Sequence, residues 1–286
     1  MAAEMAQSEW AALKAVPEKS LPLPNLERLT SKVWSEINAL CDLNQVTLNV
    51  NYDPSLFLQA NYLNTLAVAS RTMWLVNDVW TPTAMLPRQL NHLSGNIDIK
   101  VNPYVPNGWF EDDGRCNIGN HFDLKTVLRH EILHGIGVAS SFQINATSQE
   151  QVGYLSGGVC YPFVFDTKVK TVSGAQVIDG CDILPGKSIK NNLYVNNIRI
   201  YNPSVYSPGS SYHHVDLPGT LMYYGIPSKQ CLYIDRGTIE LLNGLGVECQ
   251  GTTIGIPSAA NEIKNYYSLF ILIIMSIKCL MGLLRS

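Results

Sequence analysis

The sequence has few charged residues and no concentration of positive charge. Asp, Glu, Lys and Arg make up 15% of its 286 residues, whereas roughly 25% is usual in soluble proteins. The formal net charge is −3, and no block of lysine and arginine occurs along the chain. A nucleic-acid-binding surface requires such a block, so we expect no nucleic-acid partner. A low charge density is typical of secreted and membrane-associated proteins.

The sequence also lacks C-x-x-C pairs and a visible secretory signal. Its seven cysteines are spaced singly, which argues against a separate cysteine zinc site and favours disulfides in an oxidising compartment. The pairing cannot be read from the spacing, and the odd number leaves one cysteine over. Residues 1–20 carry glutamates and polar side chains where a signal peptide needs an apolar run, which conflicts with an extracellular location.

One short stretch carries the chemistry of the chain. Residues 130–137 read HEILHGIG and fit the H-E-x-x-H pattern, in which two histidines four positions apart stand on one face of a helix and bind one zinc ion. His130 and His134 are therefore candidate zinc ligands. Glu131 is the candidate general base, because it lies next to the first histidine, where a carboxylate can take a proton from a zinc-bound water.

The residues around this motif predict a helix. Asp123 is a suitable N-cap, and apolar residues recur at helical spacing from Leu124 to Leu133. Gly135 and Gly137 predict its end, because glycine readily takes the left-handed conformation that ends helices. The alternative is a buried amphipathic helix that carries two histidines and a glutamate by chance, since the motif is short and has two free positions.

A catalytic zinc site normally has three protein ligands and an open position for water, so two histidines do not complete it. In the metzincin pattern the third histidine follows the second by six positions, after a turn at a glycine. Gly137 is in place here, but the sixth position is Ser140, a poor zinc ligand. Either the site is inactive or the third ligand comes from elsewhere in the chain. The remaining histidines are His92, His121, His213 and His214.

The run H-E-x-x-H-x-x-G, followed after a long insertion by His-Val-Asp at 214–216 and Leu-Met-Tyr at 221–223, resembles the leishmanolysin-type metzincin zinc metallopeptidases. In that family an insertion separates the glycine from the third zinc histidine, and here His214 lies 80 positions after His134. The resemblance covers residues 46–249 in outline and is specific only at the two short motifs. It implies that His214 is the third ligand of a Zn2+ ion.

The resemblance also assigns roles to the residues around this third ligand. His214 fits better than His213, because it directly precedes the Val-Asp pair, and the family motif reads as histidine, apolar residue, aspartate. Met222 corresponds to the Met-turn residue, an apolar floor beneath the metal. Tyr224, two positions later, corresponds to a tyrosine that stabilises the oxyanion in some metzincins. The alternative for Met222 is an ordinary core methionine. The alternative for Tyr224 is a tyrosine without a special role, since the chain has 14 tyrosines.

The implied fold is a metzincin-like α+β zincin. Residues 46–138 are expected to form an N-terminal catalytic subdomain with a twisted mixed sheet and the zinc helix. Residues 139–250 are expected to form an irregular, loop-rich C-terminal subdomain that holds the insertion, the third ligand and the Met-turn. Residues 1–45 are expected to form a helical extension, and residues 251–286 a linker and a hydrophobic tail.

Periodicity predicts several elements of this fold. Apolar residues at helical spacing predict helices over 26–40 and over 56–76. Alternation predicts strands at 46–50 and 97–101. In metzincins the strand before the zinc helix is the sheet edge against which substrate lies extended, so the resemblance implies that 97–101 pairs with a peptide. Asp235 is expected to cap a final helix.

The C-terminal tail differs in character from the rest. Residues 266–284 are mostly apolar and close to the ~20 residues that cross a bilayer, although Lys278 interrupts them. Small residues at 258–260, a polar spacer and an apolar end also fit a lipid-anchor signal. A buried core helix fits less well, because the run has no polar face. We therefore expect membrane attachment through this tail and a location outside the cell or at its surface.

These observations favour a zinc-dependent endopeptidase that acts on protein or peptide substrates, in which zinc activates a water and Glu131 is the general base. The first alternative is a catalytically inactive relative that uses the same fold as a binding or adhesion module at the membrane surface, and Ser140 keeps it open. The second is a metal-dependent hydrolase that acts on bonds other than peptide bonds, since it shares the ligands.

Overall fold

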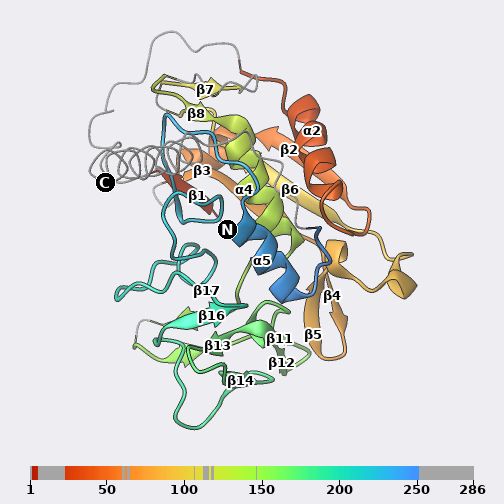
Figure 1. The fold of residues 1–286 in the computed structure, drawn as a ribbon, viewed down its shortest axis with the longest axis vertical. Helices are drawn as coiled ribbons and strands as arrows, with labels where there is room; N and C mark the ends of the chain where they lie inside the picture. Colours follow the sequence, from red (N-terminus) through yellow and green to blue (C-terminus); the bar gives the residue numbers. More distant parts are fainter. Residues whose placement is uncertain are drawn as a thin grey trace, which may run out of the picture. The chain divides into compact units, whose positions relative to one another are not determined.

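The computed structural model describes residues 2–5, 23–59, 62, 65–105, 107–111, 116, 119–145 and 147–250. The chain divides into two compact units, Met1–Thr253 and Ile254–Ser286, and all described residues lie in the first. That unit has the predicted α+β composition, with one larger sheet, a few helices and several small sheets (Figure 1). The apolar tail lies outside the described residues, and no helix within them is long and apolar enough to span a bilayer.

The larger sheet is mixed and has five strands. In spatial order they are β18 (Gly225–Ile226), β1 (Ala2–Met5), β3 (Thr65–Arg71), β6 (Asn96–Val101) and β2 (Thr47–Tyr52). β2 and β6 are parallel, and β3 runs antiparallel to β6. β1 runs antiparallel to β3 and parallel to β18, so it fills the space between them. Strands β2 and β6 confirm the predictions made from alternation.

Two helices pack against each other and against this sheet: α2 (Leu26–Asn38) and α4 (Leu124–Ile136) (Figure 1). The helix predicted over 26–40 is thus confirmed. Its residues Leu29, Val33 and Ile37 recur every four positions and are fully buried, which is the apolar stripe of an amphipathic helix. Burial of this stripe holds α2 against α4 and so supports the helix that carries the H-E-x-x-H motif.

The remaining elements are short. Helix α5 (Arg236–Leu245) begins at Asp235, as predicted, and the carboxylate of Asp235 accepts a hydrogen bond from the N–H of Thr238 (2.9 Å). The other helical elements are α3 (Pro54–Phe57) and the 3-10 turns η2 (Thr83–Met85), η3 (Arg88–Leu90) and η4 (Asp166–Lys168). The other strands are β4 (Met73–Val76), β5 (Val79–Pro82), β7 (Trp109–Phe110), β8 (Phe122–Asp123), β9 (Gln143–Ile144), β10 (Glu150–Gln151), β11 (Tyr154–Ser156), β12 (Val159–Tyr161), β13 (Lys170–Thr171), β14 (Ile178–Asp179), β15 (Asp182–Ile183), β16 (Leu193–Val195) and β17 (Ile198–Arg199).

The helix predicted over 56–76 is wrong. These residues form the end of α3, strand β3 and the first strand of the β4–β5 hairpin. Consecutive residues of β3 are buried, and a strand of this kind gives an unbroken apolar run that periodicity cannot distinguish from a buried helix. The local signal that was missed is Asn77-Asp78, with φ of 49° and 62°, a two-residue turn that closes a hairpin.

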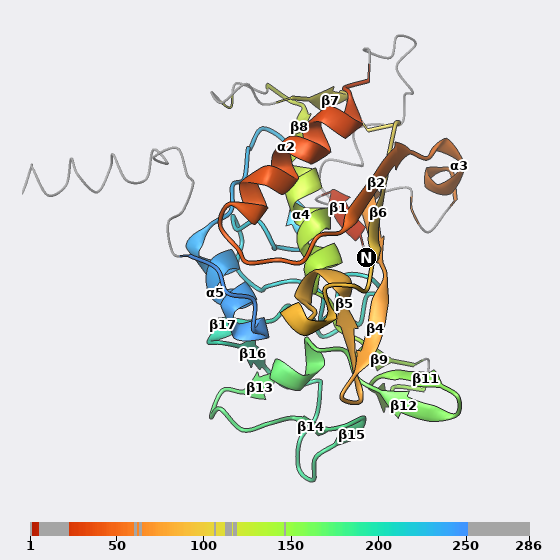
Figure 2. The same ribbon diagram turned by 90° about the vertical axis from the view of Figure 1, so that its right-hand side faces the viewer.

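The strand predicted at 97–101 exists as β6, but it is not the edge of the sheet. It lies between β3 and β2 and pairs with both, and Figure 2 shows it beside β2. β3 pairs with β6 along one side and with β1 along the other. Order along the sequence does not determine order across a sheet, because β3 crosses to the far side of β6 before the chain returns. A peptide therefore has no edge of β6 to pair with.

Residues 143–199 form small two- and three-stranded sheets that lie apart from the larger sheet in Figure 1. Disulfides join Cys41 to Cys249, Cys116 to Cys231 and Cys160 to Cys181, and Cys279 lies outside the described residues. The disulfide prediction is confirmed. Such bonds persist in oxidising compartments and so favour an extracellular or secreted protein.

Candidate metal centre

Helix α4 carries two of the candidate ligands and is buried along its whole length. It begins at Asp123, as predicted, whose carboxylate accepts from the N–H of Thr126 (2.9 Å), and it ends at Gly137, where φ is 153°. Gly135 does not end the helix. A Cβ added to Gly135 would lie 2.4 Å from Cγ2 of Ile97, so this glycine instead allows α4 to pack closely on β6.

Three histidines from two distant segments meet at one point. His130 and His134 come from α4, and His214 comes from a loop 80 positions after His134. The Nε2 atom of His130 lies 3.1 Å from those of His134 and His214, which are 3.2 Å from each other. All three residues are fully buried. Among the described residues, these three side chains form a group that could hold a metal ion.

Backbone carbonyl groups hold all three imidazole rings in one orientation. Each ring places Nδ1 against a carbonyl oxygen, which can only accept a hydrogen bond, so Nδ1 must carry the proton. In a neutral imidazole the other nitrogen, Nε2, then presents a lone pair. The three pairs are His130 with Leu221 (2.7 Å), His134 with Val138 (2.6 Å) and His214 with Ser210 (2.9 Å).

The three lone pairs point at one another, and a cation between them removes their repulsion. Burial lowers the pKa of His130 to about 4 and lowers the pKa values of His134 and His214 well below 6.5, so the rings are neutral, as metal ligands must be. A triangle with these sides has its centre about 1.8 Å from each corner. The three Nε2 atoms therefore lie close enough to one another to hold one metal ion.

Glu131 and Met222 lie on the two segments that meet here. Glu131 directly follows His130 on α4 and is fully buried. Met222 is also fully buried, and its carbonyl oxygen accepts from the N–H of Val215, next to the third histidine (2.9 Å). The preceding carbonyl, that of Leu221, orients His130. The segment predicted to be a Met-turn therefore contacts both ligand segments through its backbone.

Tyr224 lies in a cluster of tyrosines. Its ring stacks on that of Tyr201, with centroids 4.1 Å apart, and lies 4.5 Å from that of Tyr223. The backbone N–H of Tyr201 donates to the carbonyl of His214 (2.8 Å), so the cluster adjoins the third ligand segment. These contacts are with other tyrosines, and the oxyanion role of Tyr224 stays a prediction.

His213 and Ser140, the two residues that left the third ligand open, contact each other. Nδ1 of His213 accepts from the backbone N–H of Ser140 (3.1 Å), while the Oγ of Ser140 donates to a carboxylate oxygen of Asp166 (2.5 Å). His213 is thus bound to the turn after α4, whereas its neighbour joins the cluster. His92 is exposed, and the ring of His121 stacks on a phenylalanine.

Several groups at this centre carry no signal in the sequence. The carbonyl groups of Val138, Ser210 and Leu221 orient the ligands, but any residue has a carbonyl, so no residue type marks these positions. Asp166 was also missed. It lies in the middle of the insertion without a recognisable motif, and only its contact with the turn after α4 shows its place.

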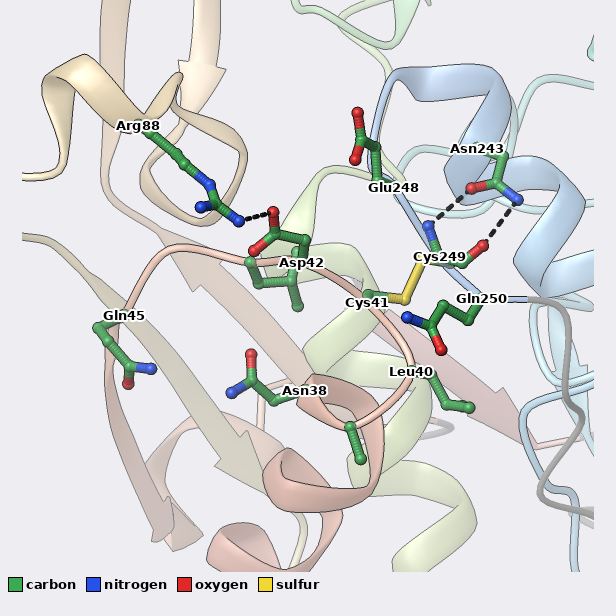
Figure 3. Close-up of a pocket in the computed structure, with 12 residues that line it drawn as sticks. Asn38, Leu40, Cys41, Asp42, Gln45, Arg88, Asn243, Glu248, Cys249 and Gln250 are labelled. Atoms are coloured by element: carbon green, nitrogen blue, oxygen red, sulfur yellow. Dashed lines mark hydrogen bonds and ion pairs between the residues drawn. A yellow bond between two sulfur atoms is a disulfide. The ribbon is translucent and has the colours of Figure 1, made fainter.

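A surface pocket elsewhere offers no comparable chemistry. It surrounds the Cys41–Cys249 disulfide (Figure 3), and three of its polar side chains are engaged with one another or with the backbone. Arg88 forms an ion pair with Asp42, and the side chain of Asn243 binds the backbone N–H of Cys249 (2.8 Å). None of the three clustered histidines lines it. The histidine centre is therefore the candidate functional site.

Comparison of the chain with protein-family models, with curated proteins and with solved structures finds no match.

Proposed function

We propose that this protein is a zinc-dependent endopeptidase with a metzincin-like centre. One observation carries the proposal: three neutral imidazoles present their Nε2 lone pairs to one point, and Glu131 adjoins the first of them on the same helix. Three histidines with a neighbouring glutamate are the ligand set and the base of hydrolytic zinc sites. The leishmanolysin-like order of motifs in the sequence supports peptide bonds as the target.

Each residue has a distinct task in this proposal. His130, His134 and His214 hold zinc, which when bound supplies Lewis acidity and lowers the pKa of a water to about 7. Glu131 would take a proton from the water that adds to the scissile carbonyl and would return it to the leaving amine. Glu131 is fully buried beside the first ligand, so its carboxylate is shielded from bulk water.

Tyr224 is proposed to donate a hydrogen bond to the oxyanion. This requires its hydroxyl to point to the zinc rather than remain with Tyr201. Membrane attachment through residues 266–284 is proposed from the apolar sequence of that tail alone.

The inactive binding module depends on Ser140 as a lost ligand. In the structure Ser140 binds His213 and Asp166, while His214 completes the group of three histidines. No ligand is missing from a centre arranged in this way, so the observation that favoured the module no longer does so. Stoichiometric zinc would also be of no use to an adhesion module.

Zinc content and hydrolysis of a broad peptide library, measured on the full chain, test the proposal. We expect about one zinc per chain and cleavage that a chelator removes and added zinc restores. Glu131→Gln should keep the zinc and lose cleavage by about 10²-fold or more, while the exposed-histidine variant His92→Ala should match the wild type. Undiminished cleavage by Glu131→Gln would refute the mechanism, and the absence of bound zinc would refute the centre.

A further inference from the structure

The carboxylate of Asp166 is the acceptor at the centre of a buried hydrogen-bond network. Asp166 is fully buried on η4. It accepts from the Oγ of Ser140 (2.5 Å), from the N–H of Ser141 (3.0 Å) and from the N–H of Phe163 (3.1 Å), and the Oγ of Ser141 also donates to it. The Oγ of Ser141 in turn accepts from the N–H of Gly153 (2.7 Å). Asp166 thus joins the turn after α4 to the insertion.

A buried carboxylate needs such donors, and here it also has a positive neighbour. Burial raises the pKa of Asp166 to about 6, against the hydrogen bonds that lower it. Burial lowers the pKa of Arg71, on β3, to about 10, against an attraction to Asp166 that raises it. The hydrogen-bond donors around Asp166 are what make an ionised carboxylate tolerable there.

The turn that Asp166 holds touches both halves of the metal centre. On one side, the carbonyl of Val138 accepts from Nδ1 of His134 (2.6 Å). On the other side, the N–H of Ser140 donates to His213, which directly precedes the third ligand (3.1 Å). The Oγ of Ser140 also accepts from the N–H of Phe142 (2.9 Å). Displacement of this turn would therefore move two of the three imidazoles.

A second contact strengthens the link to the third ligand. The ring of Phe142 packs edge to face against that of Tyr212, with centroids 5.7 Å apart. Tyr212 is fully buried and has φ of 68°, a left-handed conformation that costs about 1 kcal/mol or more for a bulky residue. Surrounding contacts must hold Tyr212 in place, and it lies two positions before His214.

We infer that Asp166 is a positioning residue for the metal centre: by fixing the turn at 138–142 it holds His134 and the segment of His214 at the mutual distance that one ion requires. The inference rests on the proposed metal centre but not on peptidase activity. Ser140 stands where compact metzincins have their third ligand. Here it connects that position to the distant loop, and Asp166 anchors it.

Zinc affinity of the full chain, measured by competition with a chromogenic chelator, tests the inference. Asp166→Ala should weaken zinc binding by about tenfold or more, as expected when a group that orients ligands is lost. Asp166→Asn should recover most of the affinity, because one amide oxygen can still accept from the N–H groups of Ser141 and Phe163. Ser140→Ala, which removes only one donor to the carboxylate, should have an intermediate effect.

Asp123→Ala is the matched control. Asp123 is likewise a fully buried aspartate at an end of α4, where it accepts from Thr126, but it lies at the end away from the histidines. It should lower stability and leave zinc affinity unchanged. The visible spectrum of the Co2+-substituted protein gives a second measurement, and we expect it to shift in Asp166→Ala and not in Asp123→Ala.

Two results would overturn the inference. One is a folded Asp166→Ala protein with wild-type zinc affinity and an unaltered Co2+ spectrum. The other is an equal loss of affinity in Asp123→Ala, because the effect would then follow stability alone. If Asp166→Ala does not fold, Ser140→Ala decides, and wild-type zinc affinity with an unaltered Co2+ spectrum in that variant would overturn the inference. A wild-type chain that binds no zinc would instead refute the metal centre itself.

Discussion

Replacement of the two adjacent histidines, one at a time, tests the assignment of the third ligand. His214 places Nε2 within 3.2 Å of both other ligands, whereas His213 accepts a hydrogen bond from the backbone of Ser140. The two substitutions remove the same side chain from consecutive positions. They should nevertheless have opposite consequences in the presence and absence of zinc.

The expected magnitudes follow from linkage. A ligand that binds only the folded state at 1,000 times its Kd stabilises that state by about 4 kcal/mol. For a domain of this size, 1 kcal/mol shifts Tm by about 2–4 °C, so zinc should raise Tm by about 8–16 °C. His213→Ala should keep this zinc-dependent rise. His214→Ala should lose nearly all of it, because two imidazoles do not form the three-cornered site.

Without zinc the order should reverse. His213→Ala leaves the N–H of Ser140 without its acceptor, at a cost of about 1–3 kcal/mol for a buried donor. His214→Ala removes one of three mutually repelling lone pairs, which offsets part of the packing it loses. Differential scanning fluorimetry measures the Tm of each variant with a chelator and with zinc, which gives the four Tm values that the argument compares. A zinc-dependent rise in His214→Ala equal to that of the wild type would show that the ligand is misassigned.

Three other perturbations follow from the structure. Gly135→Ala should lower the free energy of unfolding by about 1–2 kcal/mol despite the higher helix propensity of alanine, because the new Cβ meets a side chain of β6 at 2.4 Å; stabilisation in urea titrations would contradict the packing argument. Burial raises the pKa of Asp166 to about 6, above its ordinary 3.8, so the stability this group contributes is present below about pH 4 and is lost as the pH rises through 6. With chelator present, the wild type should therefore lose up to about 3 kcal/mol relative to Asp166→Asn between pH 4 and pH 7, and parallel pH profiles would contradict this. Ala3→Pro puts a proline into β1, a strand that pairs on both sides, and so should lower the free energy of unfolding more than Ala3→Ser, which keeps the backbone N–H; equal stability of the two variants in urea titrations would contradict the place of β1 between β3 and β18.

The parts of the fold that sequence reasoning predicted are those with local causes. Asp123 and Asp235 cap α4 and α5 through contacts with residues three positions away, so a short window contains the whole interaction. The apolar stripe of α2 is similarly complete within its own residues. β3 shows the limit, because its burial comes from α4, some 60 positions later, and a window that contains only β3 reads as helix.

The candidate metal centre also has a part that local sequence predicts and a part that it does not. His130 and His134 lie on one face of α4 because a helix repeats every 3.6 residues, so two positions in the sequence are sufficient to predict their geometry. No such rule brings His214 to them, and only the resemblance to a family with an insertion indicated it. The contacts that bring it there involve carbonyl groups of Ser210 and Leu221, which any residue could supply.

The glycine that follows the motif shows how one residue can fit two explanations. Gly135 and Gly137 both suit a helix end by composition, yet only Gly137 takes the positive φ that requires glycine there. Gly135 is needed for the close approach of α4 to Ile97 on β6, a contact between residues 38 positions apart in the sequence. That approach sets the depth of α4, and hence of both its histidines, against β6. The residue therefore serves the metal centre through packing, at a position where the sequence alone indicated only a helix end.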